Sequence, residues 1–211
     1  MKLNHKGQDM DEEMRGIFPV PIQVTTLELN IDSLIEFCYE MKRKNEKGVE
    51  LSNIGGWQSD NLVDETHTEF VKLKNKIEDA AKVYHEEINF KKTFEQKIDN
   101  IWININQKGH SNEFHIHAGA ILSGVFYLKE GKTPIVFEHP FGGINTYYWN
   151  PSIIEEWNAT NGGEMRQDSV PNLLLIFPSW VWHKVSMNKE DTDRISFSFN
   201  TQVYETEKGN E

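Results

Sequence analysis

The pattern of hydrophobic and polar positions changes its period once along the chain, near residue 98. Before it, apolar side chains recur every three or four residues over about 30–44 and over about 63–87. This spacing predicts two amphipathic helices, because it gathers the apolar side chains on one stripe of each helix. The stripes consist of Ile31, Leu34, Ile35, Cys38 and Met41, and of Phe70, Leu73, Ile77, Ala80, Ala81 and Tyr84. We expect both stripes to pack against one face of a sheet.

Local signals support the first helix and a strand before it. Asn30 precedes the first apolar position and is a favourable N-cap residue. The basic run 42–44 lies in the last turn, where positive charge complements the helix dipole. The segment 17–24 is apolar but contains Pro19 and Pro21, which predicts a strand at the edge of a sheet.

Beyond residue 98 the period falls to two, which predicts strands. Strict alternation runs through 101–106 and 194–200, and further strand candidates lie at 114–128, 134–138 and 172–177. These strands do not alternate with helices, so an antiparallel arrangement is favoured. We therefore predict a mainly β protein with N-terminal helices, in which a double-sheet jelly roll carries the helices on one of its sheets.

The same pattern indicates the domain organisation. Residues 1–16 are polar and are expected to form a flexible N-terminus, whereas 17–204 form a single domain. Within that domain we expect a helical support layer over about 30–90 and a jelly-roll core over about 98–204. The stretch 141–170 is rich in Gly, Asn and Glu and is predicted to be a long loop region, either a functional cover or an insertion.

Composition and charge narrow the possible partners. The net charge of −11 arises from 33 acidic and 22 basic residues, and such a negative field disfavours nucleic-acid binding. No apolar run approaches the roughly 18 residues of a membrane span, and residues 1–16 contain no apolar signal core. The one cysteine, Cys38, cannot form an internal disulfide, so we expect a cytoplasmic protein. The oligomeric state is left open, a homodimer included.

Three histidines in the second half have the spacing of a metal site. His115 and His117 lie two positions apart in a predicted strand, so their side chains are expected to share one face. His183 follows the apolar strand candidate at 172–177, and a jelly roll brings strands that are distant in sequence side by side. Imidazole is a common ligand of zinc, copper, iron and nickel. The three histidines therefore predict a metal site, and hence an enzyme.

An arginine on the last predicted strand adds an anion-binding group. Arg194 shares one face of that strand with Ser196, Ser198 and Asn200, while the apolar residues between them face the predicted helices. A guanidinium that points into the interior is unfavourable unless it is paired, and its planar fork suits a carboxylate. The alternative is that this polar face is simply solvated.

These residues carry a resemblance to the 2-oxoglutarate/Fe(II)-dependent oxygenases. That superfamily has a His-x-Asp/Glu pair, a distal His, and an Arg shortly after it on the final strand. Here His115-Ile116-His117, His183 and Arg194 stand in that order.

The likeness extends over most of the chain. It is clear over 115–128, in Phe177-Pro178-Ser179-Trp180 and over 194–200, and it runs more weakly through 52–57 back to about Phe18. The chain resembles the uncharacterised bacterial and phage branch of the superfamily, near the prolyl hydroxylases.

The resemblance implies a double-stranded β-helix of the cupin-like kind, with Fe(II) at its open end, 2-oxoglutarate as cosubstrate and O2 as oxidant. It also implies that Arg194 pairs with the distal carboxylate of 2-oxoglutarate and that Ser196 hydrogen-bonds to the same group. Tyr127 stands where prolyl-hydroxylase-like enzymes place a cosubstrate-binding tyrosine, and Asn104 stands near another cosubstrate contact. The implied reaction is hydroxylation of a C–H bond in a small-molecule or peptidyl substrate, prolyl included, with release of succinate and CO2.

His117 departs from the family pattern, in which two histidines and one carboxylate hold the metal. A neutral ligand leaves more positive charge at the metal, which favours the 2-oxoglutarate dianion. Glu113 or Glu138 is the alternative source of a carboxylate ligand. Three-His sites also occur in cupin dioxygenases that do not use 2-oxoglutarate and in zinc hydrolases, so such an enzyme is the second interpretation. A non-catalytic jelly-roll binding module is the third.

Overall fold

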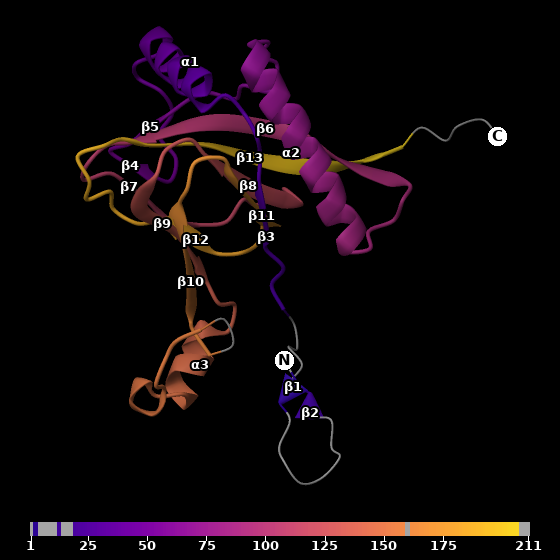
Figure 1. Ribbon diagram of the computed structural model, residues 1–211, viewed down its shortest axis with the longest axis vertical. Coiled ribbons are helices and arrows are strands. Elements are labelled where there is room, and N and C mark those ends of the chain that lie inside the picture. Colours follow the sequence, from indigo (N-terminus) through magenta and orange to yellow (C-terminus); the bar gives the residue numbers. More distant parts are fainter. Residues whose placement is uncertain (1, 4–11, 14–18, 159–160, 207–211) are drawn as a thin grey trace, which may run out of the picture.

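The computed structural model describes residues 2–3, 12–13, 19–158 and 161–206. Two antiparallel sheets face each other, and two helices, α1 (Ile31–Lys44) and α2 (Thr68–Glu87), cover the outer face of one sheet (Figure 1). This arrangement confirms the predicted mainly β jelly roll with helices packed on one sheet.

The covered sheet has six strands and the facing sheet has five. The order in the six-stranded sheet is β3 (Gln23–Thr26), β11 (Leu173–Pro178), β8 (Leu122–Tyr127), β13 (Arg194–Glu205), β6 (Phe94–Asn106) and β5 (Trp57–Gln58). The order in the five-stranded sheet is β10 (Glu164–Ser169), β9 (Gly131–Glu138), β12 (His183–Val185), β7 (Ser111–His115) and β4 (Asn53–Ile54). Two short segments, β1 (Lys2–Leu3) and β2 (Glu12–Glu13), pair separately.

The helices bury the stripes that the sequence predicts. Asn30 caps α1, since its side-chain oxygen accepts a hydrogen bond from the Ser33 backbone N–H at 3.2 Å. Phe197 of β13 packs against both helices from the side of the sheet. Its ring centroid lies 6.4 Å from that of Phe37 in α1 and 5.5 Å from that of Phe70 in α2. The alternation of β13 therefore places its apolar residues in the core under the helices, as predicted.

A second apolar cluster fills part of the space between the two sheets. It consists of Val125, Tyr127, Ile135, Phe137, Leu175, Phe177 and Val181. The remaining space between the sheets forms a cavity that is lined by both apolar and polar side chains, and the inward face of β13 contributes Arg194, Ser198 and Asn200. The interpretation of this face as merely solvated does not hold, since Arg194 and Asn200 are both buried.

Three sequence predictions need correction. The proposed strand 114–128 is two strands, β7 and β8, joined by a turn in which Gly119 has a φ of +87°. Helix α2 begins at Thr68 rather than near 63, because its start carries no capping side chain and the Glu65 carboxylate instead accepts hydrogen bonds from the next two backbone N–H groups.

The third correction concerns 141–170, whose described residues include helical and strand segments rather than loop alone. It contains α3 (Gly142–Tyr148), a short 3-10 turn (Pro151–Ile153) and β10, and it projects from the end of β9 (Figure 1). The polar sequence of β10 has no period-two pattern, so only its antiparallel pairing with β9 identifies it as a strand.

Several other expectations have simple outcomes. The strand predicted at 17–24 is β3, which begins after the two prolines and lies at the edge of its sheet. The flexible N-terminus predicted for 1–16 lies mainly outside the described residues. Cys38 is buried in α1 as a free thiol. Within the described ranges, no helix is both long enough and apolar enough to cross a membrane.

Replacement of Phe197 tests the packing of the helices on the sheet. Phe197 is fully buried, so Phe197→Ala should lower the free energy of unfolding by about 3–5 kcal/mol, since it leaves a cavity between sheet and helices. Urea unfolding followed by circular dichroism measures the change. Val83→Ala on the exposed face of α2 is the control and should change stability by less than about 0.5 kcal/mol. Equal effects would contradict this packing.

Candidate metal centre

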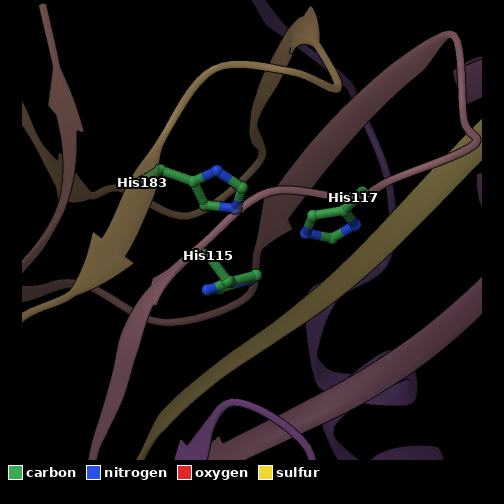
Figure 2. Close-up of side chains that lie close together, drawn as sticks. All are labelled: His115, His117 and His183. Carbon is green, nitrogen blue, oxygen red and sulfur yellow. The ribbon is translucent and has the colours of Figure 1, made fainter.

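The three predicted histidines meet at one end of the cavity. His183 on β12 lies directly opposite His115 on β7 in the antiparallel ladder, and their ring centroids are 4.4 Å apart. The ring of His117 lies 5.1 Å from each of the other two. Figure 2 shows the three rings turned toward a common centre, and one ring nitrogen of each lies within 4.8 Å of the others.

His117 reaches this centre by a different route from the one predicted. Strand β7 ends at His115, so His117 does not lie in the ladder and strand alternation does not aim it. Its backbone N–H instead donates to the Ser179 carbonyl at 3.0 Å, and its own carbonyl accepts from Ala120 in the turn that follows. These bonds hold the turn close to the segment that leads into His183.

Hydrogen bonds determine which nitrogen of each ring is free. In all three histidines Nδ1 lies within hydrogen-bonding distance of a carbonyl oxygen, which can only accept, so Nδ1 carries the proton. The three bonds run from His115 to the Glu113 carbonyl (2.7 Å), from His183 to the Val181 carbonyl (2.8 Å) and from His117 to Asn200 Oδ1 (2.6 Å). Each Nε2 therefore presents a lone pair, and that of His117 is buried with no partner.

Burial keeps the three imidazoles uncharged at neutral pH. Desolvation, reinforced by the neighbouring His115, lowers the pKa of His117 to about 4 and that of His183 to about 3. Burial also lowers the pKa of His115. Neutral imidazoles are ready to bind a metal ion, because no proton has to leave first.

Arg194 is buried beside this centre with part of its hydrogen-bonding capacity unused. Only 4% of the residue is exposed. Its Nε donates to the Thr133 carbonyl at 3.3 Å and its Nη1 to Ser196 Oγ at 3.1 Å, but its buried Nη2 has no partner. The ion pairs formed within the described part of the chain do not include it. A buried, unpaired guanidinium fits a site for an anionic ligand.

The other residues predicted to contact a cosubstrate cluster around Arg194. The Tyr127 ring centroid lies 5.1 Å from the guanidinium carbon, and the buried Tyr127 hydroxyl has no hydrogen-bond partner. Burial raises the pKa of this phenol, and the charge of Arg194 opposes the shift. Asn104 lies directly opposite Ser196 in the ladder and donates from Nδ2 to Ser198 Oγ at 3.0 Å. Arg194 and Asn104 line the cavity, whereas Tyr127 and Ser196 lie against Arg194.

The cavity has a volume of about 670 Å³ and opens between the two sheets. Three parts of its wall are not among the site residues predicted from the sequence: Trp102, Asn200 as a partner of His117, and the segment 49–61. Trp102 was detectable, because it alternates with isoleucines that face the helices and must point to the other side. The contribution of 49–61 was not, because it depends on the pairing of β4 with β7 and of β5 with β6.

The two alternative carboxylates are not part of the histidine cluster. Among the described residues, the group with metal-binding geometry consists of the three histidines. Glu138 follows Phe137, which lies directly opposite His183, so its side chain belongs to the other face of the sheet. Glu113 lines the cavity and is exposed, and its backbone carbonyl rather than its carboxylate contacts His115.

Comparisons with known proteins agree with this site. A family model described as "Putative 2OG-Fe(II) oxygenase" matches residues 100–200, a span that contains all three histidines and Arg194. The comparison with curated proteins finds no match.

Solved structures share the fold at low sequence identity. A prolyl-4-hydroxylase from Pseudomonas putida has a TM-score of 0.60 and 13% identity, covering 87% of this chain and 92% of that chain. The alpha-ketoglutarate-dependent carbocyclase SnoK of nogalamycin biosynthesis has a TM-score of 0.61 and 10% identity, and the match covers 86% of this chain and 79% of that chain. A prolyl hydroxylase from Trichoplax adhaerens, in complex with a hypoxia inducible factor peptide, has a TM-score of 0.58 and 13% identity, and the match covers 85% of this chain and 82% of that chain.

The fold and the site together combine a jelly roll, a three-histidine group with metal-binding geometry and a buried arginine. Residues 100–200, just under half of the chain, match the model of the 2-oxoglutarate/Fe(II) oxygenases. This match and the three-histidine group support a 2-oxoglutarate-dependent oxygenase that uses Fe(II), 2-oxoglutarate and O2, as the sequence resemblance implies.

The pKa values of the histidines predict how the metal-free protein responds to acid. Unfolded histidines titrate near their ordinary pKa of 6.5, whereas folded His117 and His183 titrate at about 4 and about 3. Between these values the unfolded chain binds protons that the folded chain does not. The free energy of unfolding should therefore fall as the pH decreases from about 6.5 toward 3.

Urea unfolding of the metal-free protein between neutral pH and pH 4 measures this slope. His183→Gln removes one of these groups and should lose less stability than the wild type over the same range. His139→Gln, which changes a histidine outside the cluster, should follow the wild type. Parallel curves for the wild type and His183→Gln would show that His183 is not held neutral in the fold.

Proposed function

We propose that the protein hydroxylates a C–H bond of a small-molecule or peptidyl substrate, using Fe(II) bound by His115, His117 and His183 and 2-oxoglutarate bound by Arg194. One observation carries this proposal. One ring nitrogen of each of the three histidines lies within 4.8 Å of the others, in the same cavity as a buried arginine that has an unpaired Nη2.

The histidine cluster fits Fe(II) in its chemistry. Imidazole nitrogen is a suitable iron ligand, and each ring is already oriented and in the required tautomer through its Nδ1 hydrogen bond. Three protein ligands leave positions on the metal for a cosubstrate and for O2. When bound, the iron and 2-oxoglutarate supply the oxidising power: O2 oxidises 2-oxoglutarate to succinate and CO2, and its second oxygen atom enters the substrate C–H bond as a hydroxyl group.

Arg194 favours this function over a three-His enzyme that lacks 2-oxoglutarate. A buried guanidinium without a carboxylate partner destabilises the fold, so its presence calls for an anionic ligand. The distal carboxylate of 2-oxoglutarate supplies such an anion. Arg194 is pre-oriented to receive it, because Thr133 and Ser196 fix two of its nitrogens and leave Nη2 directed elsewhere. Tyr127 offers a further hydroxyl donor beside it.

The volume of the cavity and the charge of its lining limit the kind of substrate that can bind. A volume of about 670 Å³ falls in the range of small-ligand sites, roughly 300–1,000 Å³. Apart from the histidines and Arg194, the charged residues that line it are Asp60 and Glu113, both exposed. These carboxylates, together with the net charge of −11, disfavour a phosphate-rich substrate such as nucleic acid. A neutral or cationic small molecule, or a peptide side chain such as prolyl, suits the site better.

The role of Arg194 can be tested without knowing the substrate. Arg194→Ala should leave Fe(II) binding intact but weaken 2-oxoglutarate binding about 30-fold or more, because losing one partner of a buried charge pair costs about 2–5 kcal/mol. Anaerobic titration with 2-oxoglutarate, followed by the visible charge-transfer band of the iron complex, measures the affinity. Arg166→Ala, which changes an exposed arginine, is the control. Unchanged affinity in Arg194→Ala would refute the anion role.

The metal role of His183 has a separate test. His183→Ala removes one of three converging nitrogens, so stoichiometric Fe(II) binding should be lost. Metal content after anaerobic loading and desalting measures the loss, and the circular dichroism spectrum checks that the variant is folded. His139→Ala, which changes a histidine outside the cluster, should bind iron like the wild type. Retention of one iron per chain by His183→Ala would exclude His183 as a ligand.

A further inference from the structure

His117 is held differently from the other two histidines. His115 and His183 each donate from Nδ1 to a backbone carbonyl two residues earlier in their own segment, and the ladder pairs them with each other. His117 lies beyond the end of β7 and has neither support. Its Nδ1 instead donates to the side chain of Asn200, which lies 83 positions away on β13. The orientation of this one ring therefore depends on a side chain that can be replaced.

Asn200 is itself firmly oriented. It lies directly opposite Ser123 on β8 and Asn100 on β6, its neighbours in the sheet. Ser123 Oγ donates to Asn200 Oδ1 at 2.7 Å, and Asn200 Nδ2 donates to Asn100 Oδ1 at 2.9 Å. With this pattern, the oxygen end of the Asn200 amide lies toward Ser123 and its nitrogen end lies toward Asn100. The oxygen end faces His117, so it must accept the Nδ1 proton and leave Nε2 of His117 unprotonated.

A second contact restrains the plane of the same ring. The indole of Trp102 stacks on His117, with ring centroids 5.6 Å apart and an angle of 24° between the planes. Trp102 limits the tilt of the ring, whereas Asn200 determines its rotation and its tautomer. Because Asn200 is buried, water does not readily replace its hydrogen bond to His117.

We propose that Asn200 is the positioning residue for His117, which it holds as the Nδ1–H tautomer with Nε2 directed at the metal. This inference rests on the proposed function, in which His117 binds Fe(II). Asn200 acts through His117 and does not touch the metal itself. The metal-binding group consists of three histidines and contains no carboxylate. Because the Asn200 amide is neutral, Asn200 orients the ring of His117 without adding negative charge to this site.

The charge of Asn200 gives this role a distinct consequence. Asn200→Asp keeps an oxygen that can accept from His117 and Ser123, while its second oxygen replaces Nδ2 and can accept from the Asn100 amide once that amide turns its NH2 group toward it. It should therefore preserve the position of the ring. It also places a negative charge near the metal, which opposes the binding of dianionic 2-oxoglutarate. Asn200→Asp should therefore bind metal at least as tightly as the wild type, yet bind 2-oxoglutarate more weakly.

The experiment compares the wild type, Asn200→Leu, Asn200→Asp and Thr201→Val. Thr201→Val is the matched control, because it removes a buried side-chain hydrogen bond, Thr201 Oγ1 to Gln96 Oε1 at 2.7 Å, from the adjacent position of β13. Nitrogen-15 NMR of the metal-free proteins reports the tautomer of each histidine. Calorimetric titration with Ni(II), a redox-stable probe, reports metal affinity.

In Asn200→Leu, His117 should lose its defined Nδ1–H tautomer while His115 and His183 keep theirs. Ni(II) affinity should fall roughly 10–100-fold, the usual effect of removing a group that orients a metal ligand. Asn200→Asp should restore the affinity, and Thr201→Val should match the wild type in both measurements.

Two outcomes separate this inference from the proposed function. If the wild type binds metal, and Asn200→Leu changes neither the tautomer of His117 nor the affinity, Asn200 is not a positioning residue. If Asn200→Leu changes the tautomer as expected but the wild type binds no Ni(II) or Fe(II), the hydrogen-bond assignment is supported and the metal site is refuted. An equal loss of affinity in Thr201→Val would show that the effect is structural and would overturn the positioning role.

Discussion

The alternation of side chains along β13 is the constraint on which the rest of the molecule depends. One face of the strand carries Ile195, Phe197 and Phe199, which are fully buried beneath α1 and α2. The opposite face carries the polar residues that line the cavity. The helices cover the first face and the five-stranded sheet faces the second, so Arg194 and Asn200 are buried as well. The packing of the helices thus forces a row of polar side chains, Arg194 among them, into the interior.

This arrangement leaves buried polar atoms that the protein itself does not satisfy. Most inward side chains find partners across the sheet, as Asn200 does with Ser123 and Asn100. Three of the buried atoms without a partner in the described part of the chain lie together in the region of the cavity: Nη2 of Arg194, Nε2 of His117 and the hydroxyl of Tyr127. Each unpaired buried group is unfavourable for folding. The ligands that the superfamily uses, a metal ion and a dicarboxylate, match the lone pair and the donors that are left.

The sequence predicts the fold class and the members of the site better than it predicts how they are held. The two-residue alternation of 194–200 predicted that Arg194 and its polar neighbours share one face of the strand. The helical spacing of apolar residues predicted the buried stripes of both helices. His117 was correctly grouped with His115, but the predicted reason, that both lie on one face of the same strand, was wrong. Strand β7 ends at His115, and His117 lies in the turn that follows. Strand β10 escaped prediction, since a polar segment becomes a strand only when a neighbour such as β9 offers it a ladder.

By itself the sequence determined which residues face inward and which chemical groups they bring, since local periodicity decides the face on which each side chain lies. It could not determine which distant side chains meet, because that depends on strand register. The tertiary structure brought His183 opposite His115 and placed Asn200 against His117. It also added the segment 49–61 to the cavity wall. The contact with Asn200 decided which nitrogen of His117 is free, and the contact with Thr133 of the facing sheet helped to decide which nitrogen of Arg194 is free.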